Sequence, residues 1–357
     1  MASAPQVPER MMALVYRGRD DLRIEELPVP KIRADEVLVR VEACGICPTD
    51  LKKIHQGLVP PPRVFGHETA GTLVRIGSRV QGFRVGDRVA VHHHVPCRIC
   101  HCCRRGAFAQ CPQYHRTGVT AGFEPAGGGF AGYARVMSFC LPGLVRIPPG
   151  ATMAEAAMLE PVNTVLKGVR ALGVHKGDTV LVVGQGPVGL LFNRLLTLEG
   201  ASVLACDPLE QRRRMGRHFG ARWSGPAVGA SDLAEAVRRR TRGRGLDAAV
   251  ITAPSDAAFL ESIPLLRGGG SVLVFAHTVR GREVPVDLGR VCVDEIRVLG
   301  SYSSDITLQD EVADLVFSRR LDVRPLITHQ VPLSRAAEAM GRVAAPSEGM
   351  LKVVVVG

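Results

Sequence analysis

Four cysteines lie close together in the first third of the chain, at a spacing suited to a metal ion. They follow the pattern Cys-x2-Cys-x2-Cys-x7-Cys and are Cys97, Cys100, Cys103 and Cys111. Four thiolates so near one another in sequence can surround one zinc ion in a closed tetrahedral site, the kind that stabilises structure. The spacing therefore predicts a structural zinc lobe at about residues 95–115.

A second set of residues offers mixed metal-binding chemistry. Cys47 supplies a thiolate and His67 an imidazole nitrogen. A carboxylate can come from Glu68 or from Glu160. Three protein ligands leave an open position for water or substrate, which is typical of a catalytic zinc. Because such a zinc is a Lewis acid that stabilises negative charge on oxygen, this set predicts a metal-assisted reaction of an alcohol or a carbonyl group.

Two polar residues next to Cys47 could assist this reaction. Thr49 could carry the released proton, and Asp50 could orient the imidazole of His67. Each candidate also has an ordinary interpretation, because a lone cysteine or histidine is usually a packed residue and Glu160 could be a charge at a helix end. Their occurrence together with the cysteine cluster and the loop described next favours the metal site.

A glycine-rich turn later in the chain has the spacing of a dinucleotide-binding loop. It reads Gly184-Gln-Gly186-Pro187-Val188-Gly189, after an apolar strand at 179–183 and before a helix-like segment at 190–198. Gly184 permits the tight turn, Gly186 lets the backbone approach a pyrophosphate, and Gly189 lets helix and strand pack closely. The helix N-terminus then directs its positive end at the phosphates.

An acidic residue follows the next predicted strand. Asp207 would accept hydrogen bonds from the adenosine ribose hydroxyls and repel a 2′-phosphate, so NAD is favoured over NADP. Arg212, five residues later, is either a contact on the adenosine side or a group that accommodates such a phosphate. The alternative is a glycine turn in an α/β domain that binds no dinucleotide.

The residue pattern changes near residue 152 and predicts two domains of different class. Before it, short β-rich segments such as 37–41 and 88–91 alternate with Gly, Pro and Asp turns, which predicts a mostly-β, barrel-like domain. From residue 179, apolar segments alternate with helical ones, which predicts a doubly wound parallel sheet of α/β class. A capping box, Thr152-Met-Ala-Glu155, begins a helix at the change.

The last part of the chain is expected to return to the β-rich domain. A strand at 297–300 would end the parallel sheet, and a helix-like segment at 334–343 and an apolar strand at 351–356 follow. The predicted domains are therefore 1–161 with 303–357, and 162–302.

The composition excludes several other classes of protein. The chain has 357 residues with 46% hydrophobic and 22% charged, and it contains no apolar run of membrane-spanning length. Its net charge of +11 comes from scattered arginines, and the runs at 212–214 and 238–240 fit solvated helix faces rather than a nucleic-acid surface. Residues Met1–Arg10 carry no signal-peptide pattern, so a cytoplasmic location is expected.

The chain contains ten cysteines. Clustered cysteines without a secretion signal more often bind metal than form disulfides. Outside the two metal sets, the remaining thiols are expected to be small packing residues or incidental: Cys44, Cys102, Cys140, Cys206 and Cys292.

Taken together, these residues resemble the medium-chain, zinc-dependent alcohol dehydrogenases, closest to the polyol (sorbitol) and threonine dehydrogenase branch. The motifs that carry the resemblance are Gly45-Ile-Cys47-Pro-Thr49-Asp50, Gly66-His67-Glu68-Thr-Ala-Gly71, Gly86-Asp87-Arg88-Val89, the four-cysteine lobe, Glu160-Pro161 and Gly184 to Gly189.

The resemblance implies a GroES-like catalytic domain and a Rossmann domain, with one catalytic and one structural zinc per chain. It implies that Cys47, His67 and Glu68 belong to the catalytic zinc site. Glu160 takes the place of a second cysteine ligand of other members, and Thr164 that of a threonine that contacts the nicotinamide. It also implies a homo-oligomer, a tetramer more than a dimer.

The chain departs from the family pattern at three places. Pro48 stands where glycine or arginine is common, and Lys52 stands where many members have a proton-relay histidine, so solvent water would complete the relay beyond Thr49. A run of histidines, His92-His93-His94, falls where the family lines its substrate pocket. In an extended segment alternate side chains face opposite ways, so either His93, or else His92 and His94, would face that pocket. A polar pocket wall of this kind suits a hydroxyl-rich substrate.

The expected function is hydride transfer between NAD and a small secondary alcohol, of polyol, sugar or amino-alcohol type. The alternatives are an aldehyde or ketone reductase of the same family and a non-catalytic protein that binds zinc and NAD. The zinc-free quinone reductases of the same fold lack a cysteine lobe, which this chain has at residues 97–111.

Overall fold

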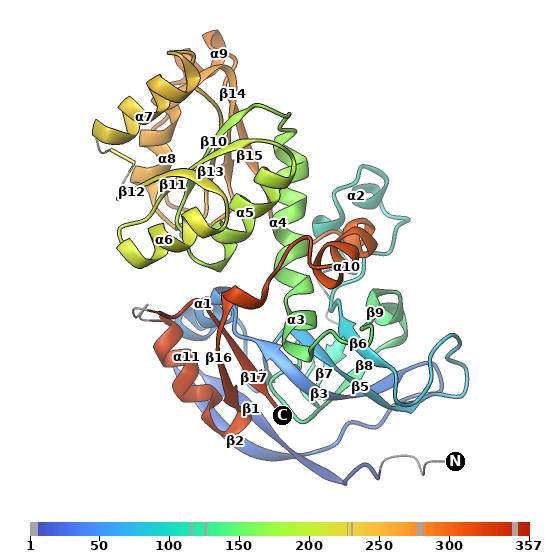
Figure 1. Cartoon of the computed structure of the whole chain (residues 1–357). Coiled ribbons are helices and arrows are strands. Elements are labelled where there is room, and N and C mark those ends of the chain that lie inside the picture. The colour runs from blue at the N-terminus through green and yellow to red at the C-terminus, as the bar shows by residue number, and fades with distance from the viewer. Residues whose placement is uncertain are drawn as a thin grey trace. The chain divides into compact units, whose positions relative to one another are not determined.

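The computed structural model describes residues 6–114, 116, 118–124, 127–226, 228–229, 231–276, 281–344 and 349–357 (Figure 1). The first five residues of the predicted N-terminal leader lie outside this part. The chain divides into two compact units, Met1–Pro161 with Asp305–Gly357, and Val162–Ser304. Each unit is described by itself below.

The first unit is built on two β-sheets. A three-stranded sheet has the order β2-β1-β4 and an eight-stranded sheet has the order β16-β17-β3-β5-β6-β9, with β8 paired to β3 and β7 to β8. The strands are β1 (Arg10–Gly18), β2 (Asp21–Pro28), β3 (Val37–Gly45), β4 (Arg63–Val64), β5 (Glu68–Ile76), β6 (Arg88–Val91), β7 (Val119–Thr120), β8 (Tyr133–Val136), β9 (Leu144–Arg146), β16 (Ile327–Pro332) and β17 (Lys352–Val356). The predicted mostly-β class of this part is confirmed.

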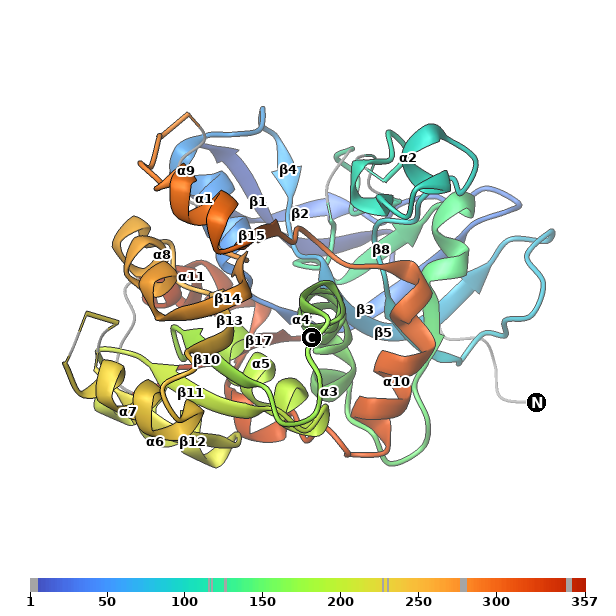
Figure 2. The ribbon, with the colours of Figure 1, turned by 90° about the horizontal axis from the view of Figure 1, so that it is seen from above.

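Helices accompany these sheets at their ends and connections (Figure 2). They are α1 (Pro48–Gln56), α2 (His101–Arg104), α3 (Met153–Ala157), the start of α4 (Leu159–Leu172), α10 (Gln309–Phe317) and α11 (Ala336–Ala344). Thr152 accepts a hydrogen bond from the Glu155 backbone while the Glu155 carboxylate accepts from that of Thr152, so the predicted capping box is confirmed. Short 3₁₀ turns lie at Phe108–Gln110, Ser138–Gly143, Ile306–Leu308, Arg324–Leu326 and Leu333–Arg335.

Strand pairing brings three distant segments to one place in the first unit. Gly45 at the end of β3 pairs with Glu68 at the start of β5, and on its other side with Val354 of β17. The expectation that the C-terminal strand returns to the β-rich part is therefore confirmed. This ladder sets the distances in the metal region, because neighbouring strands are only about 4.8 Å apart.

The second unit is a six-stranded parallel sheet in the order β12-β11-β10-β13-β14-β15. The strands are β10 (Thr179–Val183), β11 (Ser202–Cys206), β12 (Ala221–Gly225), β13 (Leu246–Ile251), β14 (Leu266–Val274) and β15 (Arg297–Gly300). The helices are the rest of α4, α5 (Pro187–Leu198), α6 (Glu210–His218), α7 (Ser231–Thr241), α8 (Asp256–Ser262) and α9 (Leu288–Val293), with a 3₁₀ turn at Ile263–Leu265. The predicted doubly wound sheet is confirmed.

Both faces of this sheet are covered, which explains its continuous apolar strands. All five residues of β10 are buried. Side chains such as Leu181 and Leu204 pack with Leu233 of α7 and Ala258 of α8 in one core cluster. Strand order reverses between β10 and β13: the chain leaves β10 toward β11 on one side and leaves β13 toward β14 on the other, which is where a ligand crevice opens in this kind of sheet.

A buried carboxylate ties the amino ends of three strands together in this unit. Asp247 accepts hydrogen bonds from the Thr179 backbone N–H at 2.7 Å, from Arg267 Nε at 2.6 Å and from Arg244 Nη2 at 3.0 Å. Burial raises the pKa of Asp247, but the hydrogen bond from Arg267 and the other donors outweigh it and hold that pKa below its usual value.

We expect Asp247→Ala to lower the free energy of unfolding by about 2–4 kcal/mol, since it leaves a buried N–H and a partly buried guanidinium without their acceptor. Chemical denaturation measures this. The matched control is Asp322→Ala, which removes a surface pair with Arg324 and should cost less than about 1 kcal/mol. Equal losses in the two variants would contradict the account.

Candidate functional site

The four predicted lobe cysteines converge in the first unit. Their sulfur atoms all lie within 4.8 Å of one another. Cys100 precedes α2, Cys103 lies within it, and Cys111 follows the 3₁₀ turn at 108–110. Arg98 has a φ of +62°, which reverses the chain between Cys97 and Cys100.

Backbone N–H groups stabilise negative charge on these sulfurs. The Cys97 N–H donates to Cys111 Sγ and the Cys100 N–H to Cys97 Sγ, each at 3.4 Å. Burial raises the pKa of Cys111, but the N–H groups of Cys97 and Tyr114 outweigh it and lower that pKa to about 6. Four converging sulfur atoms, one of them the Cys111 thiol with its lowered pKa, fit a four-sulfur zinc site.

A second group of donor atoms forms where β3, α1 and β5 meet. A donor atom of Cys47, one of His67 and one of Glu68 lie within 4.8 Å of one another. Cys47 is the residue before α1 and Glu68 is the first residue of β5. His67 follows Gly66, whose φ of +98° makes the sharp turn into the strand.

Asp50, in the first turn of α1, fixes the orientation of His67. Its Oδ1 lies 3.1 Å from His67 Nδ1, and the side chains are 2% and 11% exposed. Burial lowers the pKa of His67, but the negative charges of Asp50 and Cys47 outweigh it and raise that pKa well above its usual value. Because one ring nitrogen faces a carboxylate, the other remains for a metal, as in many histidine–metal sites.

Glu68 has a partner that sequence reasoning missed. Lys352 Nζ donates to Glu68 Oε1 at 2.5 Å and to the Ile46 carbonyl at 3.0 Å, and it also contacts Glu68 Oε2. The contact with Oε2 is an ion contact without hydrogen-bond alignment, so this buried oxygen accepts no hydrogen bond from the described residues. The signal in the sequence was a lysine inside the apolar segment 350–356.

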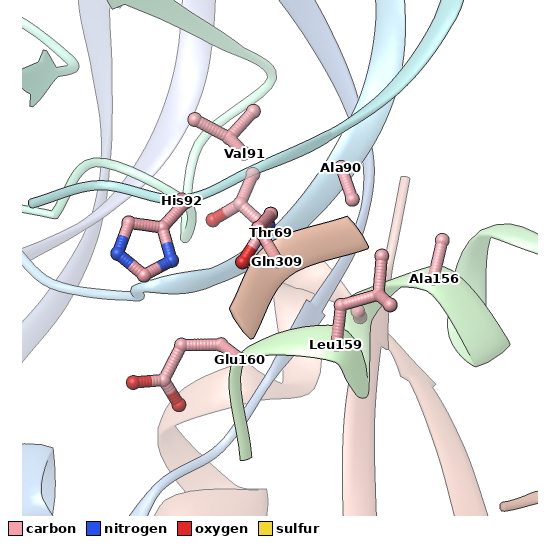
Figure 3. Close-up of a pocket in the computed structure, with 9 residues that line it drawn as sticks. Thr69, Ala90, Val91, His92, Ala156, Leu159, Glu160 and Gln309 are labelled. Carbon is pink, nitrogen blue, oxygen red and sulfur yellow. The ribbon is translucent and has the colours of Figure 1, made fainter. Parts of the chain in front are cut away.

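Glu160, the second residue of α4, lies apart from this group of three. It lines a small cavity with Thr69, His92 and Gln309 (Figure 3). Burial raises its pKa to about 7, helped by the negative charge of Glu68 and opposed by the positive charges of His67 and Lys352. The Glu160 carboxylate therefore interacts electrostatically with the group formed by Cys47, His67 and Glu68. Direct ligation of a metal by Glu160 stays a prediction.

The rings of the three consecutive histidines have different further neighbours, although those of His93 and His94 lie only 4.0 Å apart. The ring of His93 lies 5.1 Å from that of His67, His92 lines the Glu160 cavity, and His94 packs on Tyr114 at 4.9 Å. Cys140 Sγ donates to the carbonyls of His92 and His93 at 3.0 and 3.3 Å, so a thiol expected to be a packing residue also fixes this segment. His93 is therefore the histidine beside the candidate metal site.

Two other predicted participants lie on α1. Thr49 is partly exposed two residues after Cys47, and Lys52 follows it within the same helix. His55 instead pairs with Asp20 on the surface. Thr164 lies in α4 within the second unit and is partly buried.

The glycine-rich loop follows β10 in the second unit. Gly184 has a φ of +91°, and a Cβ on Gly189 would lie 1.8 Å from the Gly184 carbonyl oxygen. A Cβ on Gly186 would meet nothing within 4 Å, which leaves open space at the start of α5. Pro187 and Val188 form its first turn, and Gly186 supplies no side-chain cap. Open space beside uncapped helix N–H groups fits a phosphate-bearing cofactor.

Asp207 supports this loop from the end of β11. Its Oδ2 accepts a hydrogen bond from the Gln185 N–H at 2.8 Å, and its Oδ1 accepts one from the Leu209 N–H at 2.9 Å. Arg212 Nη1 lies 3.9 Å from Asp207 Oδ2. Asp207 and Arg212 therefore lie together, next to the loop.

Comparison with known proteins agrees with this geometry. Residues 33–148 match the model of the alcohol dehydrogenase GroES-like domain, and residues 187–318 match that of zinc-binding dehydrogenases. The chain is 30% identical to a sorbitol dehydrogenase of Bacillus subtilis over 98% of both chains. It belongs to the zinc-dependent alcohol dehydrogenase family.

Further similar proteins extend this picture. A probable D-xylulose reductase A of Aspergillus terreus is 31% identical, with 94% of this chain and 95% of that protein covered. A putative zinc-binding dehydrogenase of Sinorhizobium meliloti, solved bound to NADP, superposes with a TM-score of 0.88 at 28% identity, covering 98% and 100% of the two chains. As a member of this family, the chain has the predicted GroES-like and Rossmann folds. Among its described residues, no helix has the length and apolarity to cross a membrane.

The glycine loop yields a stability prediction for this dehydrogenase. We expect Gly189→Ala to lower the free energy of unfolding by about 1–3 kcal/mol, since the new methyl group would overlap a backbone oxygen. The control is Gly341→Ala on the exposed face of α11, where a Cβ meets nothing within 4 Å. That substitution should raise stability by about 0.5–1 kcal/mol. A Gly189→Ala variant that melts at or above the wild-type temperature would refute the close approach.

Proposed function

We propose that this protein is a zinc-dependent dehydrogenase that transfers a hydride between a secondary alcohol of polyol, sugar or amino-alcohol type and NAD. The observation that carries the proposal is the convergence of Cys47, His67 and Glu68 in a family whose similar members include a sorbitol dehydrogenase. Residues 1–161 with 303–357 would form the catalytic domain and residues 162–302 the NAD-binding domain.

The donor atoms fit a catalytic zinc. A thiolate, an imidazole and a carboxylate are all zinc ligands, and the buried Glu68 Oε2, in ion contact with Lys352, accepts no hydrogen bond from any residue that the structure describes. Zinc held there supplies Lewis-acid chemistry, which stabilises negative charge on the substrate oxygen. Glu160 completes the predicted ligand set. The four lobe cysteines would hold a second, structural zinc, which makes two per chain.

The chain's own residues orient these groups and move the proton. Asp50 contacts Nδ1 of His67, which would leave the other ring nitrogen for the metal. Thr49 would accept the proton that leaves the substrate hydroxyl and pass it to solvent, since Lys52 stands where a relay histidine is common. Thr49 and Asp50 both lie in the first turn of α1, which begins directly after Cys47. One helix therefore supplies the orienting carboxylate and the relay hydroxyl.

A hydroxyl-rich substrate is supported by His93. This imidazole is buried beside His67, and its Nδ1 has no hydrogen-bond partner among the described residues. Burial lowers the pKa of His93 well below its usual value, and the ring is neutral at pH 7 with one donor and one acceptor nitrogen. A buried polar group of this kind favours a substrate that supplies a second hydroxyl, because a plain alkyl alcohol would leave it unpaired.

NAD rather than NADP is the proposed cofactor. When bound, it would supply the hydride-accepting nicotinamide ring. Asp207, at the end of β11, supports this choice since its carboxylate would repel a 2′-phosphate, and Arg212 would contact the adenosine side. Gly184, Gly186 and Gly189 shape the loop for the pyrophosphate, with Pro187 and Val188 at the start of α5. Thr164 would contact the nicotinamide.

We further propose a cytoplasmic homotetramer with no nucleic-acid partner. None of the ten cysteines forms a disulfide, and a thiolate zinc cluster persists best in a reducing compartment. The edge strand β15 exposes Val298, 48% accessible, which supports association through the open edge of the sheet. The arginine runs at 212–214 and 238–240 lie in α6 and α7, where several of them pair with Glu210 and Glu235.

The decisive variant is the double substitution Cys47→Ser with His67→Ala. We expect turnover to fall about a thousandfold or more, because zinc contributes several kcal/mol to the stabilisation of the developing charge. Reduction of NAD with a panel of polyols, amino alcohols and simple alcohols measures turnover, and metal analysis should show one zinc per chain in place of two. The control, Cys292→Ser at an exposed thiol, should leave both values unchanged. Full dehydrogenase activity in the double variant would contradict the proposal.

Cofactor choice has a separate test by direct binding. Fluorescence titration should show that the wild-type protein binds NADH about tenfold or more tightly than NADPH, because of the Asp207 carboxylate. Asp207→Ser should narrow that ratio, whereas Glu210→Gln, which removes an equal charge three residues later, should leave it unchanged. A wild-type preference for NADPH would contradict the proposed choice of NAD.

A further inference from the structure

The pair formed by Lys352 and Glu68 is more deeply buried than an ordinary ion pair. The two side chains are 6% and 1% exposed, and they are 284 residues apart in the chain. Taking two charges out of water is costly, and a buried pair is weak evidence for stability. A pair of this kind in contact with a metal group therefore calls for another explanation.

The backbone is arranged to admit this pair. Gly45 stands between Glu68 and Val354 in the β5–β3–β17 ladder. A Cβ on Gly45 would lie 1.9 Å from Glu68 Oε2 and 2.9 Å from Lys352 Cε. The missing side chain of Gly45 thus makes the space in which the carboxylate and the ammonium group meet.

The Lys352–Glu68 pair also affects the net charge of the side chains around the proposed zinc position. Cys47 as a thiolate, Glu68, Asp50 and Glu160 would together place several negative charges around one divalent cation. Lys352 adds a positive charge that its fixed contacts keep at Glu68, since Nζ is also held by the Ile46 carbonyl. The Glu68 carboxylate therefore divides its negative charge between the ammonium group and the metal position.

We propose that Lys352 is a positioning residue that competes with the catalytic metal for the Glu68 carboxylate. This competition lowers the zinc affinity of the site and leaves more positive charge on the zinc for catalysis. The inference rests on the proposed zinc function of Cys47, His67 and Glu68. It goes beyond that function because it assigns the strength of metal binding to a lysine on the strand β17.

A purely structural role for Lys352 leads to the opposite expectation. If the lysine only pinned β17 to β3 and β5, its removal would disorder the donor atoms and loosen the zinc. If it competes for Glu68, its removal releases the carboxylate to the metal and takes away a nearby positive charge. The zinc would then be held more tightly.

The experiment measures zinc release from the full-length protein to a chelator, with no substrate present. The release phase that Cys47→Ser abolishes belongs to the mixed site, and the remaining phase, from the four-cysteine lobe, is the internal reference. We expect Lys352→Met to raise the zinc affinity of the mixed site about tenfold or more, since an adjacent positive charge is gone. Lys352→Arg should stay close to the wild-type value.

A double variant keeps the test decisive even where Lys352→Met folds poorly. Lys352→Met with Glu68→Gln removes both charges, and neutral replacement of a buried ion pair is usually tolerated. Its zinc affinity should return toward the wild-type value. Weaker zinc binding in Lys352→Met, or no return in the double variant, would overturn the inference. The absence of any Cys47-dependent zinc phase in the wild-type protein would instead refute the proposed function itself.

Discussion

The pairing of β17 and β5 on either side of β3 is the constraint on which the candidate metal centre depends. The register places Gly45 between Glu68 and Val354, and Ile46 receives a hydrogen bond from Lys352 Nζ. Cys47 follows directly, so the thiolate, the carboxylate and the ammonium group have positions set by one ladder. A one-residue slip of β17 would point Lys352 to the opposite face and leave Glu68 buried without its partner.

Negative charge in a small volume is the second theme of this region. Asp50 pairs with His67 and Glu68 pairs with Lys352, while burial and the nearby charge of Glu68 raise the pKa of Glu160 to about 7. These three acids have different neighbours and different proposed roles: Asp50 orients His67, Glu68 is a metal ligand that also pairs with Lys352, and Glu160 is a further ligand. Such a set is costly without a cation, which is why the arrangement is best explained by metal binding.

Much of this architecture could be predicted from the sequence. The strands 179–183 and 297–300 have the predicted bounds, because short apolar segments between turn residues give a strong local signal. The grouping of Cys47 with His67 and Glu68 also agrees with expectation. Other features were missed. The strand β12 (Ala221–Gly225) was missed because it carries little apolar pattern. The first part of β14, from Leu266, was missed because the glycines at 268–270 resemble a turn.

What sequence could not provide was the partner of each polar group. The Lys352–Glu68 pair depends on strand register across most of the chain, and the hydrogen bonds from Cys140 to the histidine segment depend on a turn 47 residues away. Glu160 was predicted as a ligand from its motif, yet its distance from the other donors depends on how α4 leaves the first unit. These are consequences of tertiary packing, which local patterns do not encode.

The place of β17 in the chain also has a consequence for biosynthesis. A ribosome makes the residues of the whole second unit, 162–304, before it makes the strand that supplies Lys352. The nascent β-rich segment must therefore wait with Glu68 uncompensated and one side of β3 open while the parallel sheet emerges and folds. A metal ion that reached Cys47 and His67 before that moment would meet the Glu68 carboxylate without its lysine partner.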